Sequence, residues 1–374
     1  MNAPVALRVL MFPKQDPGNP FVRRFATCLE CAGVTVDDFS YGRALRRRYD
    51  VLHVHWPDSH LVSASWWGSL VKHLRFSALI GLLRLRGTRI VWMVHNLSAH
   101  DQCHPLSRWL FPRWFPRACT HVIALTHHGL ESARQRYPVL VRKPTAVVPH
   151  GHYRHEYPVA PSRADARRQL GLQPDPVTLL FFGNVRRYKN VPRLIEMFRR
   201  MPEQAVHLVI AGLPGHGITA DELSSLCDGD ERITLRPQFV ADAEVPTYFG
   251  AADAIVLPFD SILNSGSVLL GLSFNRVVLA PRLGALPEIQ ELVGSQWLRL
   301  YDGPLTTEHL QEVCAAESLP SDSEVDLSAF DWNSTADRTL ELYRDGATAS
   351  DGTVVHARGE GASYEENRKQ YSKT

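Results

Sequence analysis

Phe181–Asn190, FFGNVRRYKN, joins the end of an apolar run to a glycine and a basic cluster. The apolar run Val177–Phe182 has the length and composition of a buried strand. Gly183 then allows the backbone to turn tightly and close to a ligand. The pattern that follows predicts a helix over Val191–Met201. We therefore read this stretch as a strand, a turn and a helix start.

The turn carries three cations, Arg186, Arg187 and Lys189, immediately before the predicted helix. Fixed positive charge beside free backbone N–H groups at a helix start favours phosphate oxygens. A solvated basic turn is the alternative interpretation. We expect a nucleotide diphosphate to bind here, with contacts from Gly183, Asn184, Arg187 and Lys189.

A second helix start lies about 80 residues further along the chain. A buried-type strand is expected at Asp253–Pro258, followed by a polar loop, a helix, and a further strand at Arg276–Ala280. Small residues with many hydrogen-bond donors at a helix N-terminus suit a pyrophosphate. The expected contacts are Asn264, Ser265, Gly266 and Ser267.

Strand-like and helical segments alternate along the whole chain, which is typical of α/β proteins with parallel sheets. A chain of 374 residues exceeds the usual domain size of about 100 to 200 residues, so two domains are expected. The predicted strands are Leu7–Phe12, Val34–Phe39, Asp50–His55, Arg89–His95, His121–Leu125 and Thr145–Val148 in the first half, and Val177–Phe182, His207–Ala211, Ile233–Arg236, Ala254–Pro258 and Val277–Ala280 in the second. The predicted divisions are residues 1–155, residues 164–324, a final helix at residues 325–345 and a disordered tail at residues 346–374.

The order of these motifs resembles the bacterial GT-B glycosyltransferases, of the family 4 type and related exopolysaccharide mannosyltransferases. The N-terminal half contributes four further stretches to the resemblance: GNPFVRR from Gly18, HVHW from His53, VWMVHNLSAHD from Val91 and VVPHGHYRHEY from Val147. The resemblance implies two Rossmann-like domains facing each other across a cleft. It also implies a metal-independent enzyme without a cofactor, whose substrate is a nucleotide diphosphate sugar, and a final helix that packs back toward the N-terminal domain.

One feature of that family is missing. Many family 4 enzymes carry two glutamates eight positions apart, and alignment on Gly266 places Leu263 and Gly271 there. The nearby carboxylates Asp260 and Glu288 are candidate replacements, and Glu288 is predicted to contact the donor. The missing pair leaves the choice between inverting and retaining transfer open.

The candidate catalytic residues lie where the fourth predicted strand ends, at His95, and in the loop after it, at Asp101. An imidazole or carboxylate can take the acceptor hydroxyl proton in an inverting transfer. In a retaining transfer, the resemblance implies that His95 binds the sugar. The alternative for His95 is a structural histidine that hydrogen-bonds to the backbone, and the alternative for Asp101 is a helix N-cap. Further cleft residues are expected at Gly18, Asn19, His55 and His150.

Metal and disulfide chemistry find little support in the sequence. His95, His100, Cys103 and His104 match no zinc-binding spacing, so no metal site is expected. The six cysteines are scattered, and the one CxxC lies late in a predicted helix, away from the helix start where a redox pair is activated.

Charge is distributed unevenly along the chain. Residues 1–150 hold 20 Lys and Arg against 8 Asp and Glu, a balance of +12, which leaves −10 for the remainder of a chain of net charge +2. Six of the eight tryptophans also lie there, and Trp66–Arg89 and Arg108–Arg117 interleave aromatic, apolar and basic residues. Cations beside indoles favour an anionic membrane surface over nucleic acid, for which no motif is visible. An amphipathic helix packed within the N-terminal domain is the alternative.

The sequence thus predicts a glycosyltransferase that moves a sugar from a GDP- or UDP-sugar to a lipid-linked or saccharide acceptor in exopolysaccharide or cell-envelope assembly. No signal-peptide pattern is found at the N-terminus, so a cytoplasmic protein, peripheral on the inner face of the membrane, is expected. The alternatives are a sugar-nucleotide 2-epimerase of the same fold and a non-catalytic binding subunit of a transferase complex.

Overall fold

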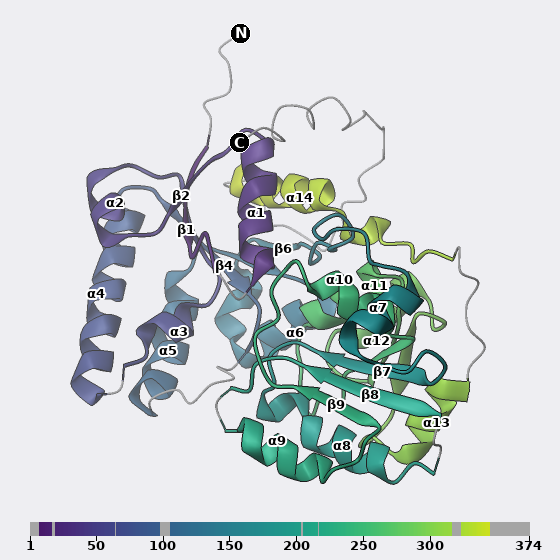
Figure 1. The fold of residues 1–374 in the computed structure, drawn as a ribbon. Coiled ribbons are helices and arrows are strands. Elements are labelled where there is room, and N and C mark those ends of the chain that lie inside the picture. The colour runs from purple at the N-terminus through teal and green to yellow at the C-terminus, as the bar shows by residue number, and fades with distance from the viewer. Residues whose placement is uncertain are drawn as a thin grey trace.

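The computed structural model describes residues 7–16, 19–63, 65–97, 105–202, 205–215, 217–315 and 323–344. These residues form two lobes, each built on a six-stranded sheet with flanking helices (Figure 1). Every strand pairing in both sheets is parallel. The structure confirms the predicted α/β class with two Rossmann-like sheets.

The N-terminal lobe has the strand order β2-β1-β3-β4-β5-β6. Its elements, in chain order, are β1 (Arg8–Phe12), α1 (Pro20–Cys31), β2 (Thr35–Asp38), α2 (Tyr41–Arg46), β3 (Val51–Val54), α3 (Pro57–Leu61), α4 (Trp66–Leu85), β4 (Arg89–Val94), α5 (Pro105–Ala118), β5 (His121–Ala124), α6 (His127–Arg136), η1 (Pro138–Arg142) and β6 (Thr145–Val147).

The C-terminal lobe has the strand order β12-β11-β10-β7-β8-β9. Its elements are α7 (Arg163–Leu170), β7 (Val177–Phe182), η2 (Arg187–Lys189), α8 (Val191–Arg199), β8 (Val206–Ala211), α9 (Ala220–Cys227), β9 (Ile233–Arg236), α10 (Val245–Ala251), β10 (Ala254–Val256), α11 (Gly266–Ser273), β11 (Val277–Pro281), α12 (Leu286–Val293), β12 (Leu298–Tyr301), α13 (Thr307–Ala315) and η3 (Ser328–Phe330).

The last described helix, α14 (Trp332–Arg344), returns to the N-terminal lobe and lies beside α1 (Figure 1). Leu340 and Tyr343 belong to the same buried cluster as Phe21 and Phe25 of α1. The hydroxyl of Tyr343 is 2.5 Å from Nδ1 of His53 on β3. Helix α14 therefore ties the end of the described chain into the N-terminal core.

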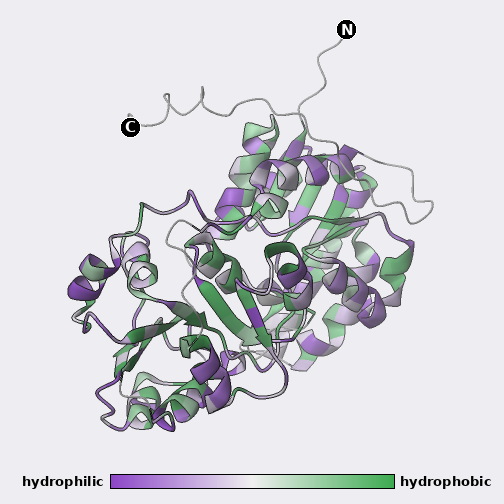
Figure 2. Ribbon diagram, turned by 90° about the vertical axis from the view of Figure 1, so that its right-hand side faces the viewer, coloured by the Kyte–Doolittle hydropathy of each residue, from purple (hydrophilic) through white to green (hydrophobic). Residues whose placement is uncertain are grey.

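Apolar residues fill the space between the sheets and their helices. One buried cluster occupies the C-terminal lobe, and two cover the opposite faces of the N-terminal sheet, since adjacent residues of β1 such as Leu10 and Met11 fall in different clusters. Figure 2 shows the same distribution, with strands coloured mainly as hydrophobic and hydrophilic residues on the surrounding helices. Strands buried on both faces explain the continuous apolar runs of the sequence.

Strand β12 was not predicted. Its residues pair with β11 at the edge of the sheet, from Leu298 opposite Val278 to Tyr301 opposite Pro281. The segment is short and includes Arg299, so it lacks the continuous apolar run that marked the central strands.

Among the helices that the structure describes, none combines the length and the hydropathy of a membrane span. The longest, α4, buries Phe76, Leu79, Ile80 and Leu83 against the N-terminal core. The same helix nevertheless leaves Trp67 69% exposed and Leu74 59% exposed. One side of α4 thus belongs to the core, as the alternative interpretation held, while the other leaves large apolar side chains in solvent.

Candidate active site

The site begins where the neighbouring strands β7 and β8 end, and a glycine follows each strand. Gly183 has a φ of 110°, which side-chain-bearing residues rarely adopt, and follows directly after β7. Gly212 follows β8, and a Cβ atom there would stand only 2.0 Å from the carbonyl oxygen of Gly183. The turn after β7 therefore folds tightly over the end of its neighbour.

Lys189 packs its side chain against the turn at Gly183. Its side chain is 8% exposed, and Nζ is 3.4 Å from the position that a Cβ on Gly183 would take. Burial, with a smaller effect from Arg186, lowers the pKa of Lys189 to about 8. Among the described residues no carboxylate pairs with this ammonium, which therefore carries a buried charge that an anion would stabilise.

The N-terminus of α11 also lies beside Gly183. Ser265 caps this helix, its Oγ accepting a hydrogen bond from the N–H of Val268 at 3.2 Å. The hydroxyl of Ser267, in the first turn, is 3.7 Å from the same notional Cβ on Gly183. A buried cation and a helix N-terminus therefore converge on one glycine, an arrangement that suits a diphosphate.

His150 connects this region to the N-terminal lobe. A Cβ on Gly266, the first residue of α11, would stand 3.4 Å from Nε2 of His150. The ring lies 4.2 Å, centroid to centroid, from Phe21 of α1, and Nδ1 is 2.9 Å from the carbonyl oxygen of Gly151. Burial lowers the pKa of His150 to about 4, so the imidazole is neutral at pH 7.

His55 and His95 form a buried pair at the ends of β3 and β4. Nδ1 of His55 lies 3.0 Å from Nε2 of His95, and the ring of His95 stacks on Trp56 at a centroid distance of 4.4 Å. Burial above all, with repulsion between neighbouring imidazoles, holds the pKa of both histidines well below the ordinary 6.5. Both rings are neutral at pH 7, and a neutral imidazole can accept a proton.

Asn264 and Glu288 have partners that differ from the predicted donor contacts. The Asn264 amide donates to the carbonyl oxygen of His95 at 3.0 Å. The Glu288 carboxylate accepts from the backbone N–H groups of His127 and His128, at 3.0 and 3.1 Å. Both side chains therefore join the two lobes, a relationship that local sequence patterns do not reveal.

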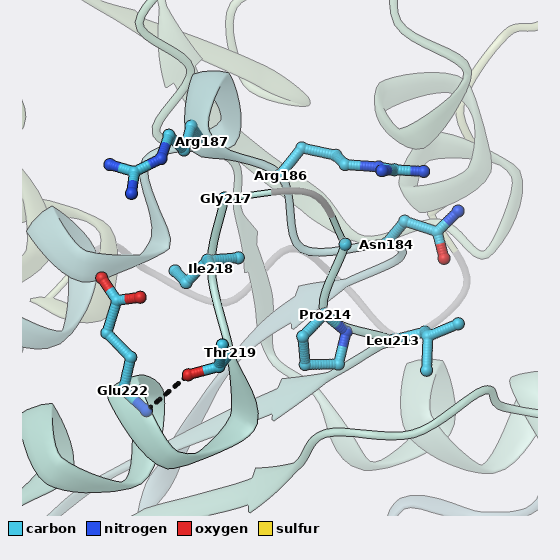
Figure 3. A pocket seen from close by; sticks show the side chains of 10 residues that line it. Asn184, Arg186, Arg187, Leu213, Pro214, Gly217, Ile218, Thr219 and Glu222 are labelled. Atoms are coloured by element: carbon cyan, nitrogen blue, oxygen red, sulfur yellow. Dashed lines mark hydrogen bonds between the residues drawn. The ribbon is translucent and has the colours of Figure 1, made fainter. Parts of the chain in front are cut away.

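A pocket of ≈ 750 Å³ extends outward from the turn after β7 (Figure 3). Arg187 and Glu222 lie on one side of it in this view, and Asn184 and Arg186 on the other. Its remaining lining residues are mainly small or apolar: Leu213, Pro214, Gly215, Gly217, Ile218 and Thr219. Polar ends and an apolar middle suit a nucleoside.

Glu222 is a pocket residue that was not predicted. It stands three positions after Thr219, the N-cap of α9, whose Oγ1 accepts from the N–H of Glu222 at 3.1 Å. That spacing is typical of a helix capping box, but the hydrogen bond from the Thr219 N–H to the glutamate carboxylate, which would complete the box, is not formed between these two described residues. The carboxylate makes no hydrogen bond or ion pair with other described residues. The one signal in the sequence that could have identified Glu222 is its place shortly after strand β8, in the turn and helix start that face the ligand site.

The remaining predicted residues divide into two groups. Asn19 caps α1, its side chain accepting from the N–H of Phe21 at 3.1 Å. Gly18 and Asp101 lie outside the described residues, as do His100, Cys103 and His104. In the part of the chain that the structure describes, no group of three or more His, Cys, Asp or Glu side chains could hold a metal ion.

Comparisons with known proteins agree on one family. Residues 176–300 match the model of "Glycosyl transferases group 1". The chain is 32% identical over 331 residues to the GDP-mannose:glycolipid 4-beta-D-mannosyltransferase of Xanthomonas campestris pv. campestris, covering 86% of this chain and 88% of that protein.

Solved structures show the same fold. Sucrose-phosphate synthase from Thermosynechococcus elongatus superimposes with a TM-score of 0.60 at 17% identity, covering 90% of this chain and 95% of that one. Anabaena HepE in complex with UDP and glucose gives 0.59 at 15% identity, covering 90% and 97%.

Proposed function

This chain is a glycosyltransferase with the GT-B fold, and on that premise we propose that it transfers mannose from GDP-mannose to a lipid-linked saccharide with inversion of configuration. The site observation that carries the proposal is the buried ammonium of Lys189, which pairs with no described carboxylate and lies with Ser267 beside Gly183. The donor and acceptor classes are those named for the Xanthomonas relative. Similarity to a transferase over 86% of the chain favours this function over an epimerase.

The diphosphate of the donor is assigned to Gly183, Lys189 and the N-terminus of α11. Lys189 and the helix N–H groups neutralise charge on the leaving phosphate as the bond from the anomeric carbon to the phosphate oxygen breaks. The guanosine extends into the pocket between Asn184 and Glu222, where Leu213, Pro214 and Ile218 provide apolar contacts.

Inversion follows from the configurations of donor and product. GDP-mannose carries an α-linked sugar, and the relative's name specifies a β product. The acceptor hydroxyl must therefore attack the anomeric carbon from the face opposite the diphosphate, and a base must take its proton. We assign that role to His95, a neutral imidazole at the end of β4.

The acceptor's lipid fits the outer surface of α4 and α5, two helices that contact each other in the N-terminal lobe. Trp66, Trp67 and Trp109 are 45%, 69% and 55% exposed there, and the Arg113 guanidinium lies 4.3 Å from the centroid of the Trp109 ring system. Neither helix contains an acidic residue. We infer that this surface binds anionic membranes at the cytoplasmic face, as envelope polysaccharide assembly requires.

A donor panel tests the proposal. The protein is incubated with GDP-mannose, GDP-fucose, UDP-glucose or UDP-galactose, with and without a lipid-diphosphate-linked saccharide, and nucleotide release is measured. We expect release from GDP-mannose that increases when the acceptor is present. No release from any donor by folded protein would contradict the proposal, and preference for a UDP-sugar would contradict its donor assignment.

A further inference from the structure

Glu288 makes an unusual contact across the two lobes. It lies in the first turn of α12 in the C-terminal lobe, and each of its carboxylate oxygens accepts one hydrogen bond from the first two residues of α6. A helix start presents unpaired N–H groups and the positive end of the helix dipole. A carboxylate satisfies both, and here it comes from a residue about 160 positions away in the chain.

Asn264 makes a second contact beside the first. Its amide donates to the carbonyl oxygen of His95, and the next residue, Ser265, caps α11. Oδ1 of Asn264 is 3.5 Å from Oγ1 of Thr126, the residue that caps α6. The two contacts therefore meet at the start of α6 and reach both the proposed base and the proposed diphosphate site.

We propose that Glu288 and Asn264 form an interdomain clasp, a pair of positioning residues that hold His95 in register with the donor diphosphate. The proposal rests on the proposed function for the roles of His95 and the diphosphate site. It replaces the prediction that these two side chains bind the donor. The clasp acts on the relative position of the lobes, whereas the donor contacts of the proposed function, Lys189, Ser267 and the nucleoside pocket, all lie in the C-terminal lobe.

The start of α6 allows this contact to be tested without changing a functional side chain. His127 is the first residue of the helix, a position where proline is tolerated because its N–H has no partner within the helix. His127→Pro removes the N–H that donates a hydrogen bond to Glu288, whereas His127→Ala keeps this N–H. Glu288→Gln keeps the shape of the side chain but removes its charge and one of its two acceptors.

We would measure kcat, and the Kd of GDP and of GDP-mannose by calorimetry, for these variants and for the double variant E288Q/H127P. We expect E288Q and H127P each to lower kcat at least several-fold and to leave both Kd values within about twofold. The double variant should lose little more than either single one, because both changes break one contact. H127A should behave as wild type.

Two outcomes would overturn the clasp. A rise in the Kd of GDP-mannose in E288Q, with an unchanged kcat, would return Glu288 to the donor site. Independent, multiplicative effects of E288Q and H127P on kcat would show that the contact is absent. Thermal unfolding of wild type, E288Q, H127P and E288Q/H127P measures the coupling between Glu288 and His127 without an activity assay. A wild-type protein that fails to transfer sugar would therefore contradict the proposed function, while the clasp would still be tested.

Asn264→Ala supplies the second half of the test. It removes the donor to the His95 carbonyl, and we expect a lower kcat with an unchanged Kd for GDP. Small-angle scattering should show a larger radius of gyration for E288Q/N264A than for wild type. An unchanged radius together with an unchanged kcat would contradict the proposal.

Discussion

His55 and His95 share a single short contact, Nδ1 to Nε2 at 3.0 Å, inside a region where burial keeps both imidazoles neutral. One ring must donate and the other accept. If His95 donates through Nε2–H, its Nδ1 keeps a free lone pair, which a general base needs. His55 then carries its proton on Nε2, a buried atom without a hydrogen-bond partner among the described residues. This unsatisfied group would be the cost of setting the tautomer of His95.

Replacing His55 tests that tautomer. We expect His55→Ala to lower kcat by about 10- to 100-fold. This loss is smaller than the full contribution of a general base, because His95 itself is still present. His55→Asn should recover much of the loss, because its amide oxygen can accept from Nε2–H of His95. The pH profile of kcat in wild type should keep its acid limb below the ordinary histidine pKa of 6.5. Equal losses in the Ala and Asn variants would argue against a tautomer role.

Donor binding should depend on the protonation of Lys189. With its pKa lowered to about 8, the side chain is charged at pH 7 and loses its proton as the pH rises through 8. The charged form binds a diphosphate better, so GDP should bind several-fold more weakly at pH 8.5 than at pH 7. Lys189→Arg keeps its charge over this range and should show no such change. Calorimetry at both pH values measures the effect, and equal wild-type affinities would contradict it.

The nucleoside pocket should recognise guanine through Glu222. Its carboxylate, which has no partner among the described residues, can accept from the N1–H and 2-amino groups of guanine. A bidentate contact of this kind discriminates between bases by about 1 to 3 kcal/mol. Wild type should therefore bind GDP about tenfold or more tightly than IDP, which lacks only the 2-amino group. Glu222→Ala should weaken GDP binding most and bring the two affinities together. An unchanged ratio of GDP to IDP affinity would exclude Glu222 from guanine recognition.

Membrane binding should require the exposed indoles of α4 and α5. Trp67→Ala with Trp109→Ala should reduce sedimentation with anionic vesicles at low salt, because the indoles enter the interface while the arginines attract the headgroups. Leu292→Ala removes a half-exposed apolar side chain from the C-terminal lobe and serves as the control. Failure of the wild-type protein to sediment with anionic vesicles would remove the proposal.

The sequence predicted those features that are written in local patterns. The apolar run ending at Phe182, the turn at Gly183 and the helix from Val191 all have the predicted form, because buried parallel strands and helix starts impose composition over a few residues. The edge strand β12 lacks that composition and was missed.

Contacts between distant segments were not predictable in the same way. Glu288 reads as an acidic residue in the first turn of a helix, and only the docking of the lobes gives it the N–H groups of α6 as partners. His53 reads only as the first histidine of the HVHW stretch, and the sequence does not show that its ring is buried against Tyr343 of α14. Such roles depend on how separately formed elements pack, which no local pattern records.

Product analysis tests the central claim most directly. GDP-mannose is incubated with the protein and a lipid-diphosphate-linked saccharide, and the product is examined by mass spectrometry and by NMR of the new anomeric centre. The account predicts one added hexose in β linkage with wild type, and loss of nearly all product with Lys189→Ala, which removes the charge facing the leaving diphosphate. An α-linked product would contradict the inverting mechanism, and folded wild-type protein that adds no hexose would contradict the assignment of donor and acceptor.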